Sequence, residues 1–348
     1  MKNVSKLFLL AAAGTLTLTL SACGGDVADK KAETQVAIMG AGSSFIYPAM
    51  SRWANSYYEK TGVQVNYQPI GSGGGQRQIF AKTVNFAASD QPLSNEMLEK
   101  YNLIQFPAIV GGIVPVINVP GIKPNEMVLD GRVLADIYLG KITYWDDPAI
   151  EKLNPSLKLP HAAIITVHRA DGSGTTYNFA TYLAELNPRW KAEVGIDTSL
   201  QWPVGIGAKG NQGVAAQVKQ VQDSIGYVEY AYAKSTHMTT VKMINKEGYS
   251  VTPDLNSFAQ AAKYAKWQPA DNYNMILANQ PGQDSWPIVA TTFILLPKEA
   301  SINVNDNIKK FFEYAYSKEG DETARKLDYV GIPQDVVKGI ENYWQAAK

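Results

Sequence analysis

Cysteine and histidine are scarce in this chain of 348 residues, which contains one Cys and three His. A single cysteine cannot form an internal disulfide or a multi-thiolate metal site, and His161, His168 and His237 show no metal-ligand spacing. The 32 basic side chains are balanced by 32 acidic ones, so no polycationic surface for nucleic acid is expected. The composition therefore argues against a metal site and against a nucleic-acid partner.

Long apolar runs and repeats are also missing. After the first 22 residues, no segment is long and apolar enough to span a membrane, which takes about 20 residues. The sequence has no repeat of fixed period, no low-complexity tract and no Walker A motif. The hydrophobic fraction of 45% still supplies ample core material, and a prior of about 150 residues per domain predicts two domains.

Residues 1–22 have the pattern of a signal peptide. Lys2 and Lys6 supply a positive start, and the apolar stretch that follows is too short for a transmembrane helix. The end of the segment, Leu20-Ser21-Ala22-Cys23, resembles a bacterial lipobox, so we expect cleavage before Cys23 and lipidation of this cysteine. Ordinary cleavage near Ala22, with Cys23 unmodified or removed, is the alternative. Residues 23–35 are expected to be a tether, and the folded part to be exported to the periplasmic or cell-envelope side of a bacterial membrane.

Strand-like and helical patterns alternate along the rest of the chain, which predicts an α/β fold. Strands are expected at 36–39, 63–70, 84–88, 163–167 and 291–296. Helices are expected where apolar residues recur with helical spacing, as at Met50, Trp53, Ala54 and Tyr57, and again near 79–84, at 179–186 and in a closing helix at 308–315. The apolar run 110–117 is predicted to be an extended crossover into a second domain.

Three loops share one arrangement, in which a strand leads through Gly, Ser and Thr residues into a helix. They lie at 40–45, 71–76 and 171–176. The first turn of a helix has free N–H groups and a partial positive charge, and glycines let the backbone approach a ligand, so such a loop can hold an anion. The plain alternative is that each Ser or Thr is a helix N-cap and each Gly a turn residue.

Arg169 precedes the third loop, two residues before Asp171. A guanidinium offers a planar fork of donors that suits oxyanions and stays charged, and Asp171 is placed to hold that fork. A purely structural ion pair between Arg169 and Asp171 is the alternative.

Asp90 is unexpected near an anion site, because a carboxylate repels an anion. An ionised Asp only accepts hydrogen bonds, so it fits a ligand that carries a proton, such as HPO₄²⁻ or H₂PO₄⁻. Sulfate at neutral pH has no proton and would face Asp90 with acceptors alone, which predicts discrimination against it. The alternative is that Asp90 caps a helix near Leu93 or lies in a proline turn.

Two other motif matches are weak. Gly205-x-Gly207-x-x-Gly210 has the spacing of a dinucleotide fingerprint, but it follows a poor strand pattern and lacks a clear acidic partner. Gly172-Ser173-Gly174 lacks the first glycine of a nucleophile elbow, since Asp171 stands there. His168 is near Ser173 in sequence, but a catalytic triad is defined by geometry.

Taken together, the motifs resemble those of the PstS-type phosphate-binding proteins, the extracytoplasmic receptors of bacterial high-affinity phosphate ABC importers. The resemblance covers nearly all of the chain from about residue 38 onward. It rests on Gly40-Ala41-Gly42-Ser43-Ser44-Phe45, Ile70-Gly71-Ser72-Gly73-Gly74-Gly75, Ala88-Ser89-Asp90-Gln91-Pro92-Leu93-Ser94, Arg169-Ala170-Asp171-Gly172-Ser173-Gly174-Thr175, Ile225-Gly226-Tyr227-Val228-Glu229-Tyr230 and Trp286-Pro287-Ile288.

The resemblance implies an α/β, two-domain periplasmic binding protein fold (type II-like) with a hinge and a central ligand cleft. Domain I would comprise 36–110 and 286–348, and domain II 111–285. The implied phosphate contacts are Ser44, Phe45, Ser72, Asp90, Arg169, Ser173, Gly174 and Thr175, with Asp171 in support. The family often has Thr where this chain has Ser44, and the hydroxyl is kept.

The implied mechanism is reversible capture of phosphate, with no catalysis and no cofactor. The implied partners are inorganic phosphate and the membrane permease of the importer, with a lipid anchor and a monomeric chain. An exported phosphatase, with a Ser or Asp nucleophile and Arg169 holding the phosphate, is the alternative from another class. A binding protein for another oxyanion or for an organic phosphate is a third reading.

Overall fold

The computed structural model describes residues 37–299 and 302–346. The predicted signal peptide, the tether and Cys23 lie outside the described residues. The described part contains a nine-stranded sheet with the order β2-β1-β3-β12-β4-β8-β6-β7, in which β9 also pairs with β4. Its strands are β1 (Ala37–Gly42), β2 (Gln64–Gln68), β3 (Phe86–Ser89), β4 (Leu103–Asn118), β6 (Ile165–Arg169), β7 (Ile206–Ala208), β8 (Ser224–Glu229), β9 (Thr239–Thr240) and β12 (Val289–Pro297). A smaller sheet joins β5 (Val128–Leu129), β10 (Lys242–Ile244) and β11 (Ser250–Val251).

Helices connect these strands. They are α1 (Tyr47–Thr61), α2 (Ser72–Phe80), α3 (Asn95–Lys100), α4 (Gly131–Tyr138), α5 (Pro148–Leu153), α6 (Gly174–Leu186), α7 (Pro188–Glu193), α8 (Gly210–Gln220), α9 (Tyr230–Ser235), α10 (Leu255–Ala262), the 3₁₀ helix η1 (Pro269–Asp271), α11 (Ile302–Tyr316), α12 (Lys318–Lys326) and α13 (Gln334–Ala346). Among the described residues, no helix has the length and apolar character needed to cross a bilayer.

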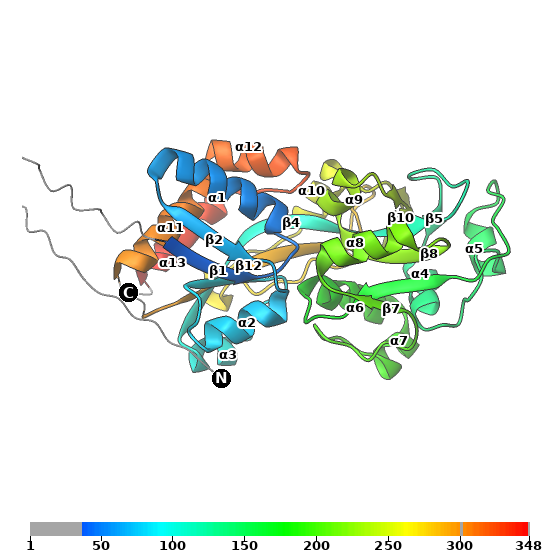
Figure 1. Ribbon diagram of the computed structural model, residues 1–348, viewed down its shortest axis with the longest axis horizontal. Coiled ribbons are helices and arrows are strands. Elements are labelled where there is room, and N and C mark those ends of the chain that lie inside the picture. Colours follow the sequence, from blue (N-terminus) through cyan, green and yellow to red (C-terminus); the bar gives the residue numbers. More distant parts are fainter. Residues whose placement is uncertain (1–36, 300–301, 347–348) are drawn as a thin grey trace, which may run out of the picture. The chain divides into compact units, whose positions relative to one another are not determined.

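The strand directions divide the large sheet into two groups. Strands β2, β1 and β3 run parallel to one another, and β12 lies antiparallel between β3 and β4. On the other side of β4, β8 is antiparallel to it, and β6 and β7 run parallel to β8. We call the first group with α1–α3 and α11–α13 the first lobe, and β8, β6 and β7 with α4–α9 the second lobe (Figure 1). The predicted α/β class is confirmed.

Strand β4 belongs to both lobes. Its residues 103–112 pair with β12, and its residues 113–118 pair with β8. The change of partner falls at Ile113, whose N–H donates to Ile288 O at 2.8 Å and whose carbonyl accepts from Trp286 Nε1 at 2.9 Å. The apolar run predicted as a crossover is therefore the second part of a longer buried strand. The predicted domain limits of 36–110, 111–285 and 286–348 stay a prediction.

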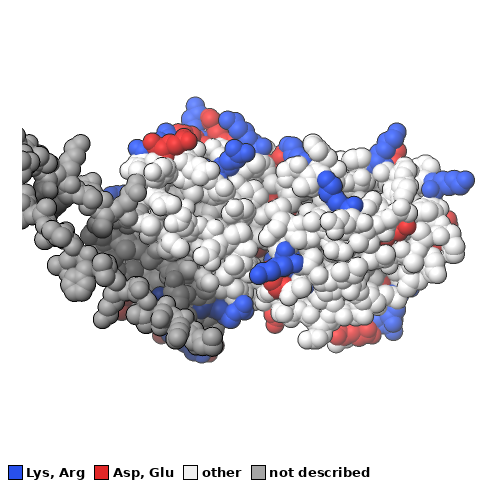
Figure 2. All heavy atoms as spheres, in the orientation of Figure 1, with Lys and Arg blue, Asp and Glu red and all other residues white. Residues whose placement is uncertain are grey.

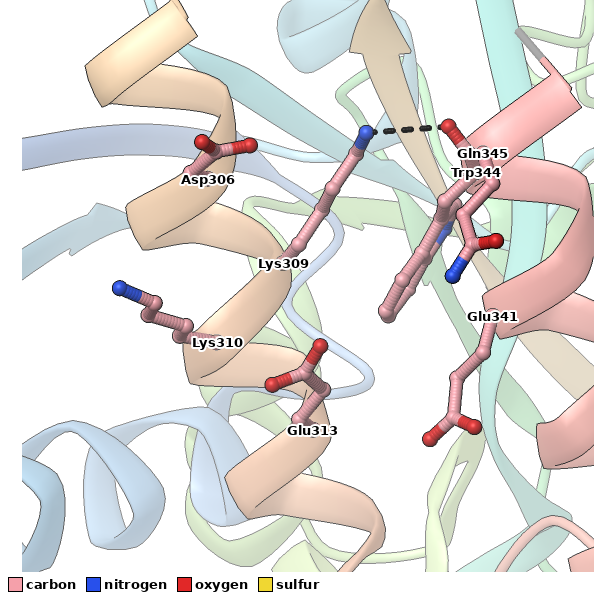
Figure 3. Close-up of a pocket in the computed structure, with 7 residues that line it drawn as sticks. All are labelled: Asp306, Lys309, Lys310, Glu313, Glu341, Trp344 and Gln345. Atoms are coloured by element: carbon pink, nitrogen blue, oxygen red, sulfur yellow. Dashed lines mark hydrogen bonds between the residues drawn. The ribbon is translucent and has the colours of Figure 1, made fainter.

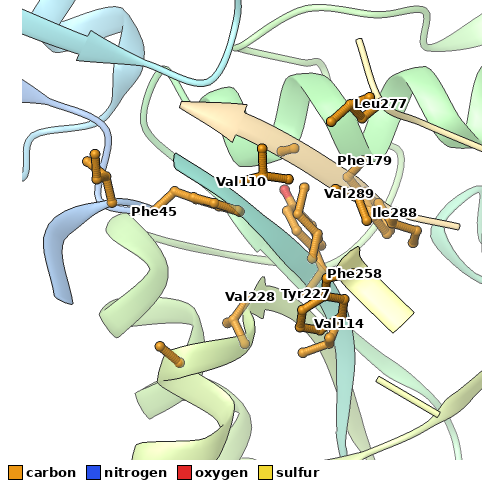
Figure 4. Close-up of a cluster of buried hydrophobic side chains, with 14 of the residues drawn as sticks. Phe45, Val110, Val114, Phe179, Tyr227, Val228, Phe258, Leu277, Ile288 and Val289 are labelled. Atoms are coloured by element: carbon orange, nitrogen blue, oxygen red, sulfur yellow. The ribbon is translucent and has the colours of Figure 1, made fainter. Parts of the chain in front are cut away.

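The main hydrophobic core is continuous across β4. Figure 4 shows Phe45 from the first lobe, Phe179 and Tyr227 from the second, and Val110 and Val114 from β4 in one cluster. All five side chains are buried. Helices α1, α11 and α12 lie on one side of the first-lobe strands and α2 and α3 on the other (Figure 1). The loops at the strand ends are thus held between rigid, well-packed elements.

The predicted elements correspond to observed ones with three corrections. The loop predicted at 71–76 is the first turn of α2, which runs from Ser72 to Phe80, so the helix expected near 79–84 lies earlier in the chain than predicted. The helix at 308–315 lies in α11 but does not close the chain, since α12 and α13 follow it. Helix α12 buries only Gly320 and Ala324, so its sequence carries little apolar periodicity. The third correction concerns Gly205-x-Gly207-x-x-Gly210, where a poor strand pattern was expected. The structure has strand β7 there, followed by α8.

Gly75 is required by close packing between α2 and β1. A Cβ at this position would lie 2.5 Å from Gly42 Cα and 2.7 Å from Ala41 O, which are backbone atoms. A Cβ on Gly213 in α8 would meet nothing nearer than 3.6 Å. The two helical glycines therefore differ in the space available for a side chain.

We expect Gly75→Ala to destabilise the protein by about 1–3 kcal/mol, because the overpacked helix must move away from β1. Gly213→Ala is the matched control, and helix propensity predicts a gain of up to about 1 kcal/mol for it. Urea unfolding, followed by tryptophan fluorescence, measures both. A stabilised Gly75→Ala variant would contradict the close packing of α2 on β1.

Candidate functional site

The ends of three strands bring together the predicted site residues. Ser43 to Phe45 follow β1, Asp90 follows β3, and Arg169 ends β6. Helices α2, α6 and α8 begin beside them at Ser72, Gly174 and Gly210. Ligands of open α/β sheets bind outside the carboxyl ends of the strands, where helix N-termini also point. The predicted loops therefore meet at the position where this fold class binds small molecules.

Asp90 is the buried acidic centre of the site, with 1% of its surface exposed. Its Oδ2 accepts from Ser43 Oγ at 2.6 Å, and its Oδ1 accepts from Thr292 Oγ1 at 2.7 Å. Ser72 Oγ lies 3.4 Å from Oδ2 and accepts the Asp90 N–H at 3.2 Å. Asp90 therefore acts as an acceptor toward every side chain that bonds to its carboxyl group.

Burial raises the pKa of Asp90 from 3.8 to about 6, although the hydroxyls of Ser43 and Thr292 and the charge of Arg169 act in the opposite direction. A carboxyl group with a raised folded-state pKa binds its proton more tightly in the folded protein. Its contribution to stability is therefore present below the unfolded pKa and is lost as the pH rises through about 6. Above this pH the protein carries a buried negative charge at the site.

Arg169 is held in a fixed orientation by Asp171. Its Nε donates to Asp171 Oδ1 at 2.7 Å and its terminal nitrogen to Oδ2 at 2.6 Å, a bidentate pair. Gly210 N–H also donates to Asp171 Oδ1 at 3.0 Å. Burial opposes ionisation of Asp171, but these bonds and the charge of Arg169 hold its pKa below the ordinary value. The second terminal nitrogen of Arg169 donates to Thr175 Oγ1 at 3.3 Å, so the fork faces the start of α6.

The two lobes meet at the site through direct hydrogen bonds. Gly174 N–H donates to Ser72 Oγ at 3.1 Å, and Gly73 N–H donates to Gly172 O at 2.9 Å. Asn178 in α6 donates to Asp90 O at 2.7 Å. A Cβ on Gly174 would lie 2.6 Å from both Asp90 Cβ and Ser72 Oγ, so this position needs glycine. The first turn of α6 is therefore placed against the acidic centre of the other lobe.

Ser44 is joined to the second lobe by Asn211. The backbone N–H and the side-chain amide of Asn211 donate to Ser44 Oγ at 3.1 and 3.0 Å. The same amide donates to Thr175 Oγ1 at 3.2 Å, and its oxygen accepts Glu229 N–H at 2.9 Å. Tyr232 OH donates to Ser44 O at 2.6 Å. Ser44, Thr175 and Arg169 thus form one connected network.

The structure brings all of the predicted contact residues to this one buried place: Ser44, Phe45, Ser72, Asp90, Arg169, Ser173, Gly174 and Thr175. Two of them also make local bonds within their own loops. Phe45 N–H donates to Ser43 Oγ at 2.9 Å, and Ser173 Oγ accepts Thr176 N–H at 3.0 Å as the N-cap of α6. The helix-cap alternative for Ser173 is therefore realised, and the role of these residues as ligand contacts stays a prediction. Asp90 caps no helix, because the N-cap of α3 is Ser94.

The sequence analysis missed three polar residues of the site: Ser43, Asn211 and Thr292. Ser43 lies within the motif Gly40–Phe45, but nothing in its local sequence points to Asp90. Asn211 directly follows Gly210 in the weak dinucleotide match, which proves to mark a strand and a helix start at the site. Thr292 has no local signal, because it reaches Asp90 from 202 positions away through the pairing of β12 with β3.

The visible surface has no concentration of charge of one sign that would attract anions. Figure 2 shows basic and acidic side chains scattered singly and in small groups over this face. No group of three or more potential metal-ligating His, Cys, Asp or Glu side chains is found in the described ranges. A separate hollow of about 390 Å³ between α11 and α13 is lined by charged side chains and Trp344, none of them a predicted contact residue (Figure 3). Anion binding must therefore depend on the local geometry around Asp90 and Arg169.

Comparisons with known proteins agree on one family. Residues 29–319 match the model of the PBP superfamily domain. The chain is 50% identical over 309 residues to the phosphate-binding protein PstS of Haemophilus influenzae, covering 88% of this chain and 92% of that protein. It is also 50% identical to PstS of Pasteurella multocida, covering 88% of this chain and 90% of that one.

Solved structures share the fold at lower identity. A phosphate-binding protein named PfluDING, bound with phosphate, aligns with a TM-score of 0.72 and 19% identity over 88% of this chain and 93% of that one. A phosphate ABC transporter substrate-binding protein from Clostridium perfringens, with bound phosphate, aligns with a TM-score of 0.62 and 19% identity over 85% of this chain and all of that one. The periplasmic binding protein fold expected from the sequence is confirmed. The chain belongs to the PBP superfamily and, within it, to the PstS family of phosphate-binding proteins.

Proposed function

We propose that this protein binds inorganic phosphate between its two lobes and serves as the extracytoplasmic substrate-binding component of a phosphate ABC importer. The observation that carries the proposal is Asp90, a buried acceptor within a set of donors. Arg169, Ser72, Thr175 and the N–H groups at the start of α6 supply positive charge and hydrogen bonds, which suit a small oxyanion. Asp90 requires that this anion carry a proton. The names of the 50% identical relatives agree with this chemistry.

Binding is reversible capture, in which the lobes close over a dehydrated anion. Ser44, Ser72 and Asp90 belong to the first lobe, while Arg169 and Thr175 belong to the second, so only the closed form completes the site. Each charge-assisted hydrogen bond contributes about 1.5–3 kcal/mol. The closed form is the species that the membrane permease of the importer recognises.

The protein acts without catalysis and without a cofactor. A phosphatase of the serine type needs a base beside its nucleophile. Ser173 instead accepts a backbone N–H as a helix cap, while His168 stacks on Trp202 at 4.6 Å and bonds to Arg169 O. Proteins about half identical to this chain are named as binding proteins.

The mature chain is a monomer, anchored by a lipid on Cys23 at the outer side of a bacterial membrane. Support comes from the lipobox-like sequence that ends at Cys23 and from the small polar residues that follow it.

Calorimetry with the wild-type protein tests the proposed ligand. We expect phosphate to bind at neutral pH and sulfate to bind far more weakly, by up to about 10⁴-fold, because sulfate leaves Asp90 without a donor. Equal dissociation constants for the two anions would refute the role given to Asp90. Binding of neither anion would refute the proposed function.

Asp90→Asn tests the same contact from the protein side. An amide can donate to an oxyanion, so we expect the preference for phosphate over sulfate to fall by more than the affinity for phosphate does. In the wild type, the preference should decline below a pH of about 6, as Asp90 takes up a proton. Asp284→Asn, at an exposed position, is the charge-matched control. An unchanged anion preference in Asp90→Asn would count against the assignment.

Mass spectrometry of the native N-terminus tests the anchor. We expect the mature chain to begin at Cys23 with a diacylglyceryl group, and Cys23→Ala to release the protein from the membrane fraction. A mature terminus near residue 23 without added lipid would instead support ordinary cleavage.

A further inference from the structure

Two hydroxyls from neighbouring strands flank the Asp90 carboxylate. Strand β3, which Asp90 follows, lies between β1 and β12, with Gly42 opposite Ala88 and Phe293 opposite Ser89. Ser43 continues β1 and Thr292 precedes Phe293, so the sheet brings both side chains beside Asp90. Ser43 N–H also donates to Ala88 O at 2.8 Å, which extends the β1–β3 ladder up to the site.

The Ser43 hydroxyl has a defined direction. It donates to Asp90 Oδ2 at 2.6 Å and accepts from Phe45 N–H at 2.9 Å. A hydroxyl carries one hydrogen, and the acceptance from Phe45 leaves that hydrogen to Asp90. Ser43 is buried, with 1% of its surface exposed, so water does not compete for either bond.

Thr292 holds the second carboxylate oxygen. Its Oγ1 donates to Asp90 Oδ1 at 2.7 Å, and the residue is buried. The register of β12 against β4 shifts between Thr292 and Phe293, an irregularity of the kind that redirects side chains next to functional sites. Thr291, the preceding residue, is also buried, but within the described part of the chain its hydroxyl has no hydrogen-bond partner.

These bonds limit what Asp90 can offer a ligand. A carboxylate has about four lone-pair sites, and Ser43 and Thr292 use one on each oxygen. Ser72 lies at the longer distance of 3.4 Å from Oδ2, while its own oxygen accepts two N–H groups. Because Ser43 and Thr292 donate to Asp90, both favour the ionised carboxylate over the protonated one.

We propose that Ser43 and Thr292 are positioning residues for anion recognition, which keep Asp90 an acceptor and thereby set the lowest pH at which the protein prefers phosphate to sulfate. This inference rests on the proposed function. Neither residue needs to touch the anion, since both act through Asp90. Without their hydroxyls, Asp90 protonates at a higher pH and then donates a hydrogen bond, which sulfate can accept.

The other ionisable groups facing Asp90 do not titrate in the relevant range. Arg169 stays charged. The hydroxyls of Tyr67 in β2, Tyr232 in α9 and Tyr329 after α12 also interact electrostatically with Asp90, and burial raises the pKa of each above its ordinary value. The carboxyl titration of the ligand-free protein between about pH 5 and 8 therefore reports on Asp90 itself. Phosphate loses its second proton in the same range, so the anion preference of each variant is compared with that of the wild type at the same pH.

The test compares Ser43→Ala and Thr292→Val with the wild type, by two measurements. The first is the carbon-13 chemical shift of the Asp90 carboxyl group in the ligand-free protein, titrated with pH. The second is the ratio of sulfate to phosphate dissociation constants, measured by calorimetry from about pH 5 to about pH 8. Thr291→Val is the matched control, because it removes a buried hydroxyl from the same strand without touching Asp90. Thr292→Ser restores the hydroxyl and serves as the rescue.

We expect each hydroxyl removal to raise the midpoint of the Asp90 titration by about one to two pH units and to move the loss of phosphate preference by the same amount. Thr291→Val should keep the wild-type midpoint, and Thr292→Ser should return to it. Midpoints within about 0.3 pH units of the wild type in both Ser43→Ala and Thr292→Val would overturn the inference. If one of these two variants fails to fold, the Asp90 midpoint of the other variant alone supports or overturns the inference.

The two measurements also separate this inference from the proposed function. If the wild type binds no phosphate, the proposed function fails, while the carboxyl titration still reports whether Ser43 and Thr292 control Asp90. If the wild type prefers phosphate and the variants lose affinity equally at every pH, the function stands and the positioning role fails.

Discussion

The site depends on burying a negative charge that the fold must compensate. A carboxylate away from water is costly unless hydrogen bonds and an opposite charge stabilise it. Here Ser43 and Thr292 donate to the two oxygens of Asp90, and Arg169 lowers its pKa from the other lobe, yet burial still raises it to about 6. Asp90 can therefore take up a proton at a pH not far below neutral, and the donors around it favour the ionised form.

The ion pair of Arg169 and Asp171 plays a different part from Asp90, because each of its two charges neutralises the other. Asp171 receives both donors of one edge of Arg169 and the Gly210 N–H, which fixes the guanidinium while its remaining nitrogen reaches Thr175. A rigid arginine offers its free edge without losing side-chain entropy on binding. The site thus combines one carboxylate that orients a cation with another that is surrounded by hydroxyls.

Much of this arrangement could be predicted from local sequence. Glycine loops between a strand and a helix, the Arg169–Asp171 spacing and the unexpected Asp90 are short-range patterns with a physical meaning, and the structure brings them together. Thr292 could not be predicted, because strand pairing across 202 positions leaves no trace in nearby residues. Asn211 could have been predicted as a site residue only if Gly205-x-Gly207-x-x-Gly210 were taken as a strand, loop and helix start rather than as a nucleotide fingerprint. Helix α12 was missed because it buries few side chains, whereas α13 could have been predicted, since Val337, Ile340 and Trp344 recur with helical spacing.

Strand β4 has a mechanical consequence. Its ladder bonds change from β12 at Gly112, opposite Val289, to β8 at Ile113, opposite Glu229. The segment that leads into β12 nevertheless holds Ile113 as well, because Ile288 O accepts the Ile113 N–H and Trp286 Nε1 donates to the Ile113 carbonyl. The Phe258 ring occupies the space beside Gly112 where a side chain would stand. Torsion of the strand at this junction would therefore have to strain two hydrogen bonds and displace one aromatic ring.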